Sequence, residues 1–78
     1  MTACTMDKCV EKAMTKIKAA QGLRYIRALR DVTVSPDVAL SEFVARFTPC
    51  RDRKDEVALV LMERPDVRNI LRCAGFQP

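Results

Sequence analysis

Apolar side chains recur at helical spacing along most of the chain. In residues 6–21 they lie three and four positions apart, which is the pattern of one buried helical face. Thr5 is a suitable N-cap and Gly22 a suitable stop, so we expect a helix over 6–21. Its inward residues are expected to be Met6, Cys9, Val10, Ala13, Met14, Ile17 and Ala20.

A second, shorter helix is expected over residues 23–31, with Leu23, Ile26 and Leu29 turned inward. Residues 32–34, Val-Thr-Val, favour a strand by propensity, but no other segment offers a partner for pairing. A three-residue strand alone is not stable, so this segment is predicted to be an extended connector.

Prolines and cap residues set the limits of three more helices. Ser35-Pro36-Asp37 favours a helix start, and this third helix should end before Pro49. Asp52 is the expected N-cap of a fourth helix, and a fifth should run from Pro65 to Gly75. The inward residues of these helices are expected to be Leu40, Phe43, Val44, Phe47, Val57, Ala58, Leu61, Met62, Val67, Ile70, Leu71 and Ala74.

Size and composition agree with a single small helical domain over residues 1–78, an all-α compact bundle of four to five short helices. The chain is 49% hydrophobic and 31% charged, which is a globular balance. No apolar run approaches the roughly 20 residues of a membrane span. The N-terminus lacks the pattern of a secretory signal, so a cytoplasmic or otherwise intracellular setting is predicted.

Four cysteines leave three interpretations open: a zinc site, two disulfides, or free thiols. Zinc sites usually show close C-x2-C pairs, which this chain lacks, and disulfides are typical of secreted domains. We favour free thiols, because cysteine is often buried as a small apolar side chain. On this interpretation Cys9 and Cys73 lie on buried stripes, whereas Cys4 and Cys50 are partly exposed near helix ends.

Few residues could support catalysis. The chain has no His, which is the commonest general base near neutral pH, and its two glycines cannot form a phosphate-binding loop. Cys50 is the best nucleophile candidate, because Arg51 and Arg53 beside it would stabilise a thiolate. We therefore predict a non-enzymatic protein that needs no metal or cofactor.

Basic residues recur every four positions in two helices of a chain whose net charge is +4. Such rows are either ordinary solvated faces or docking surfaces for an acidic partner. Arg and Tyr side chains in the second predicted helix could extend such a surface. The residues predicted to contact a partner are Lys8, Lys12, Lys16, Arg24, Arg27, Arg64, Arg68, Asn69 and Arg72.

Residues 55–76, DEVALVLMERPDVRNILRCAGF, resemble the helix-turn-helix of many bacterial and phage regulators. Ala58 matches the small residue on the first helix of that motif. The inward positions of its second helix are matched by Val67, Ile70 and Leu71. The resemblance implies a second helix that lies in the major groove of DNA.

In that arrangement Arg68, Asn69 and Arg72 would face the bases, since Arg pairs with guanine and Asn with adenine. The turn departs from the family, because it lacks the usual Gly and is one residue shorter. A single helix kinked at Pro65 is an equal alternative to a turn at residues 62–66.

Two functions follow from these patterns. The first is a small helical regulator or inhibitor that docks onto another protein through an acidic patch of that partner. The alternative is a DNA-binding regulator that uses residues 56–76. A homodimer is compatible with both, because a core this small often gains support from a partner.

Overall fold

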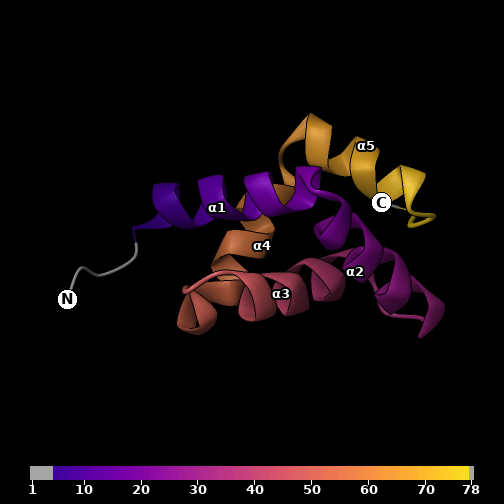
Figure 1. Ribbon diagram of the computed structural model, residues 1–78, viewed down its shortest axis with the longest axis horizontal. Coiled ribbons are helices and arrows are strands. Elements are labelled where there is room, and N and C mark those ends of the chain that lie inside the picture. Colours follow the sequence, from indigo (N-terminus) through magenta and orange to yellow (C-terminus); the bar gives the residue numbers. More distant parts are fainter. Residues whose placement is uncertain (1–4, 78) are drawn as a thin grey trace.

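The computed structural model describes residues 5–77, and these form five α-helices without a strand (Figure 1). A short 3-10 turn at Arg51–Arg53 leads into the fourth helix. The all-α prediction is thereby confirmed. The helices are α1 (Met6–Lys18), α2 (Ala20–Asp31), α3 (Pro36–Phe47), α4 (Lys54–Met62) and α5 (Pro65–Cys73).

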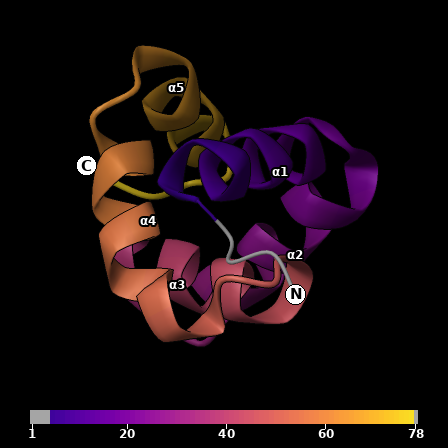
Figure 2. The same ribbon diagram turned by 90° about the vertical axis from the view of Figure 1, so that its left-hand side faces the viewer.

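One core lies between the helices, as Figures 1 and 2 show from two directions. Phe43 of α3 is its largest fully buried side chain, and every helix contributes aliphatic residues to the same core. Of the residues expected to face inward, only Ala20 and Cys73 are exposed in the described part of the chain. The helical stripes of the sequence therefore identify the core almost completely.

The first predicted helix was too long. Ala19 is extended (φ −79°, ψ 151°), so α1 ends at Lys18 and α2 begins at Ala20. Gly22 is not a stop but a buried residue within α2. A Cβ on Gly22 would lie 2.0 Å from the Lys16 carbonyl oxygen, so the two helices meet where only glycine fits.

The predicted helix starts are partly confirmed. The Thr5 hydroxyl accepts the Lys8 backbone N–H at 3.3 Å, as an N-cap should. Ser35 is at the N-cap of α3, but its hydroxyl bonds to the Asp37 carboxylate, which lowers the pKa of that carboxylate. Asp52 is not an N-cap, because the chain makes a 3-10 turn there and Arg53 precedes α4.

The predicted end of α5 is confirmed as a Schellman motif. Gly75 has φ +101° and donates its N–H to the Arg72 carbonyl at 3.0 Å. The N–H of Phe76 bonds to the Leu71 carbonyl at 3.0 Å, and the Phe76 ring is buried. The last residues described thus fold back onto the core.

A disulfide joins Cys9 of α1 to Cys50, which follows α3. Their Cα atoms are 6.1 Å apart, within the range of natural disulfides. The prediction of free thiols is wrong for this pair, and Cys50 is buried rather than exposed. Cys73 is a free and exposed cysteine, and Cys4 lies outside the described residues.

Two further findings concern the described residues alone. They contain no group of three or more His, Cys, Asp or Glu side chains that could hold a metal ion. None of their helices is long and apolar enough to cross a membrane. Disulfides are more common in oxidising compartments than in the cytoplasm. The predicted cytoplasmic setting is therefore not supported by the disulfide and stays a prediction.

Reduction of the disulfide should lower the free energy of unfolding by about 3–4 kcal/mol, because the bond closes a long loop in the unfolded chain. The two cysteines are 41 positions apart in the sequence. Urea titrations followed by circular dichroism, with and without a reductant, measure the change. Cys73→Ala should leave it intact, and a reductant effect of the same size in Cys9→Ala/Cys50→Ala would contradict the assignment.

Gly22→Ala should destabilise the fold by about 1–3 kcal/mol, because the added methyl forces α1 and α2 apart. Helix propensity alone would predict a gain of about 1 kcal/mol. Gln21→Ala, at an exposed position of the same helix, is the control. A urea titration that shows Gly22→Ala more stable than the wild type would rule out the tight contact.

Candidate protein-docking groove

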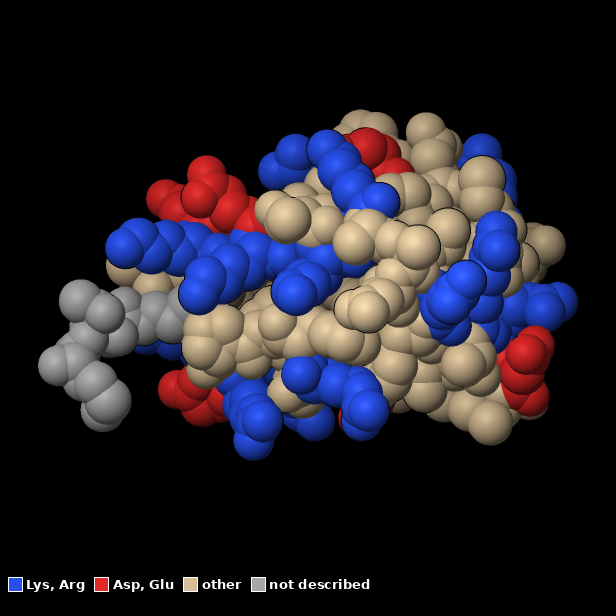
Figure 3. All heavy atoms as spheres, in the orientation of Figure 1, with Lys and Arg blue, Asp and Glu red and all other residues tan. Residues whose placement is uncertain are grey.

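Three exposed lysines of α1 line one side of an open groove of about 720 Å3. Phe47 and Pro49, from the end of α3 and the segment after it, line the groove as well. Lys8, Lys12 and Lys16 are therefore brought together as predicted. Figure 3 shows Lys and Arg side chains in a row over α1, on the side of the molecule that faces the viewer.

The apolar wall of the groove is held by aromatic packing. The Phe47 ring is half-buried and meets Tyr25 of α2 edge-on, with 5.3 Å between ring centroids. Its centroid is also 5.2 Å from that of the buried Phe43. Such pairs stabilise a fixed orientation, so Phe47 offers a pre-organised apolar contact.

The disulfide places the lysine row over this wall. Cys9 follows Lys8 directly, and Cys50 follows Pro49, so the bond ties both sides of the groove together. Successive lysines are four residues apart, so α1 rises by about 6 Å between them. The row and its apolar wall are thus held in a fixed relation.

The lysines have no ion-pair partner among the described residues. Of the residues that the structure describes, Glu11 is the one carboxylate that lines the groove with them. Like charges four residues apart repel by a few tenths of a kcal/mol per pair. An acidic ligand would therefore relieve a repulsion that the chain itself leaves in place.

Other predicted contact residues lie elsewhere. Arg24 and Arg27 are exposed on α2, but neither lines the lysine groove. Arg46 and Arg51 line a second groove of about 510 Å3 that adjoins the first at Phe47. Neither arginine is among the predicted contact residues, although Arg51 was considered as a neighbour of the Cys50 thiol. The signal in the sequence was their position on either side of Phe47 and Pro49.

The segment between α4 and α5 is a true turn rather than a kink. Arg64 is extended (φ −85°, ψ 127°), so the helix stops at Met62 and a new one begins at Pro65. Glu63 and Arg64 alone connect the two helices. The kinked-helix alternative is therefore excluded.

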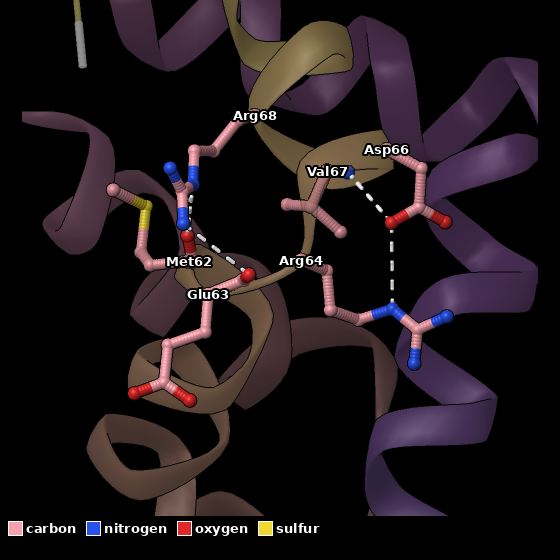
Figure 4. A network of polar contacts seen from close by, with 6 residues as sticks. All are labelled: Met62, Glu63, Arg64, Asp66, Val67 and Arg68. Carbon is pink, nitrogen blue, oxygen red and sulfur yellow. Dashed lines mark hydrogen bonds and ion pairs between the residues drawn. The ribbon is translucent and has the colours of Figure 1, made fainter.

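Arg68 ties the start of α5 to the end of α4 (Figure 4). Its Nε donates to the Met62 carbonyl at 2.8 Å, and its Nη2 to the Glu63 carbonyl at 3.3 Å. Carbonyls at a helix C-terminus lack partners within the helix. The guanidinium group satisfies them and places its positive charge at the negative end of the helix dipole.

Arg64 is also engaged within the chain. Its Nε lies 3.4 Å from Asp66 Oδ1, which accepts the Val67 backbone N–H at 3.0 Å as well (Figure 4). Desolvation raises the pKa of Asp66, but the hydrogen bond and charge of Arg64 and the backbone hydrogen bonds of Val67 and Asp66 together outweigh it, so the net pKa is lowered. The resulting stabilisation is present above the ordinary pKa and is lost as the pH falls through the lowered value.

Only some of the residues that carry the helix-turn-helix resemblance lie as that motif requires. The inward positions agree with it, since Ala58, Val67 and Leu71 are fully buried. Asn69 and Arg72 are exposed on α5, as a DNA-reading face would require. Arg68, however, bonds to the α4 carbonyls, so the row of arginines is not a free basic surface.

Arg68→Ala should lower the free energy of unfolding by about 1 kcal/mol, because two helix-terminal carbonyls lose their charged partner. Arg72→Ala, one turn further along the exposed side of α5, should change it by less than about 0.5 kcal/mol. Urea titrations of both variants make the comparison. Equal stabilities would show that Arg68 does not cap α4.

Comparison with models of known protein families, with curated proteins and with solved structures found no match to this chain. No activity or partner is therefore carried over from a relative. Function has to be inferred from the groove and from the exposed helix faces.

Proposed function

We propose that this chain is a non-enzymatic binding protein that regulates or inhibits another protein by docking onto its acidic surface. The observation that carries the proposal is the groove in which Lys8, Lys12 and Lys16 lie opposite an apolar wall. Acidic side chains of the partner would pair with the lysines. An apolar side chain of the partner would pack on Phe47 and Pro49.

The chemistry of the groove suits a protein segment. Complementary charges give specificity and speed association, whereas most of the affinity of an interface comes from its apolar centre. From Lys8 to Lys16 the helix rises by about 12 Å, or a little over two turns. A partner helix with acidic residues at matching intervals and one apolar residue between them would fit this row.

DNA binding is the second candidate, favoured by the true turn before α5 and by the exposed Asn69 and Arg72. Two features count against it. Arg68 is bonded within the chain, and Arg64 is paired with Asp66. A DNA-binding surface also depends on several free cations that replace the counterions of the phosphates.

A pair of charge-reversal variants tests the proposal by affinity capture from a lysate, with and without nuclease. The first variant is Lys8→Glu/Lys12→Glu/Lys16→Glu. The control is Arg24→Glu/Arg27→Glu/Arg72→Glu, which changes the net charge equally but leaves the groove intact. We expect a nuclease-resistant protein partner that the lysine variant loses and the control retains.

The opposite pattern would favour the second candidate. Capture that requires nucleic acid, falls steeply with salt and disappears in Asn69→Ala/Arg72→Glu would indicate DNA binding through α5. Retention of a protein partner by the lysine variant would also overturn the proposal, because the groove would then not be the docking site.

A further inference from the structure

The outward face of α4 is both apolar and acidic. Leu59 is 64% exposed and Val60 is 38% exposed, although the opposite side of α4 is buried in the core. Asp55, Glu56 and Glu63 are exposed on the same outward face. A helix that is apolar on both sides usually has a neighbour on each.

The acidic side chains on this face form no ion pairs within the described part of the chain. Lys54, the basic residue at the start of α4, pairs with Glu42 of α3 at 3.8 Å. A basic protein of net charge +4 thus carries one acidic helix face with an apolar residue in its middle.

We propose that this face of α4 binds the lysine groove of a second copy of the chain. The inference rests on the groove of the proposed function and names one occupant for it. The three carboxylates of one copy would pair with Lys8, Lys12 and Lys16 of the next. Leu59 would pack on the wall that Phe47 and Pro49 form.

The two surfaces match in length as well as in charge. Lys8 and Lys16 are eight positions apart, as are Asp55 and Glu63, and eight positions correspond to about 12 Å of helix. Charge pairs at both ends of an apolar contact are the arrangement expected of a specific interface.

The contact must be head-to-tail. In Figure 2, α4 forms the left-hand edge of the molecule and α1 lies to its right, and in Figure 1 part of α4 passes behind α1. The lysine groove and the acidic face are therefore two different surfaces, carried by α1 and α4. Interfaces built from two different surfaces extend into chains or close into rings rather than forming a two-fold dimer.

Sedimentation velocity over a concentration series tests this with two one-sided variants. The groove variant is Lys8→Glu/Lys12→Glu/Lys16→Glu, and the face variant is Glu56→Lys/Leu59→Lys/Glu63→Lys. We expect wild-type species that grow with concentration and shrink with added salt. Each variant alone should stay monomeric, with self-association weakened at least about tenfold.

The decisive sample is a mixture of the two variants that contains no wild-type chain. The reversed groove attracts the reversed face, because the three introduced glutamates and the three introduced lysines carry opposite charges. The groove variant also keeps a normal α4 face, and the face variant keeps a normal groove. Oligomers should therefore reappear on mixing, and a mixture that stays monomeric would overturn the proposal.

Circular dichroism establishes that each variant is folded, and Glu56→Lys/Glu63→Lys replaces the face variant if the triple change unfolds it. Wild-type chain that stays monomeric, or variants that associate as well as the wild type, would contradict the inference. The proposed function is tested separately, because the face variant keeps its groove. It should still capture an acidic partner protein after losing self-association.

Discussion

The bond between Cys9 and Cys50 is the constraint on which the candidate site depends. It fastens the first half of α1 to the segment that follows α3, where Pro49 has already turned the chain away from the helix. Lys8 and Pro49 are the immediate neighbours of the two cysteines, so the same bond fixes the spacing of the groove. Stability and binding geometry are therefore coupled, because whatever loosens this bond also loosens one wall of the groove relative to the other.

The helical stripes and most helix limits could be predicted, because they depend on local spacing and cap chemistry. The break at Ala19 could not. Nothing in the letters around it favours an end to the helix, and the break exists because Gly22 packs against the Lys16 carbonyl beside Phe43. The pairing of Cys9 with Cys50 has a similar origin, since it depends on where α1 lies over α3 and not on the spacing of cysteines. Cys73 was predicted to be buried but is exposed. It lies at the edge of the apolar stripe of α5, where a side chain can be either buried or exposed.

Of the candidate site, the lysine row was predictable from its four-residue spacing, whereas the apolar wall was not. Phe47 looks like an ordinary inward residue, and its partial exposure arises because α3 ends there. Arg68 was predicted to be free for a partner, because helix geometry places it on the outward side of α5. Its long side chain instead reaches back and bonds to the end of α4. The turn between α4 and α5 has no glycine that would close the helix with backbone bonds. The departure from the helix-turn-helix pattern thus explains why an arginine of that motif serves as a cap.

The two proposals together imply competition for one groove. A groove that accepts the α4 face of another copy cannot hold an acidic partner protein at the same time, because both would pair with Lys8, Lys12 and Lys16. Linkage then requires that partner binding favour single chains and that self-association weaken partner binding. Salt screens the charge pairs of both contacts. The relative affinity of the groove for a second copy and for a partner protein is therefore set by the apolar contacts, which come from Leu59 in the first case and from the partner's side chain in the second. If self-association is weak, the second copy would occupy the groove only until a partner with a better apolar fit displaced it.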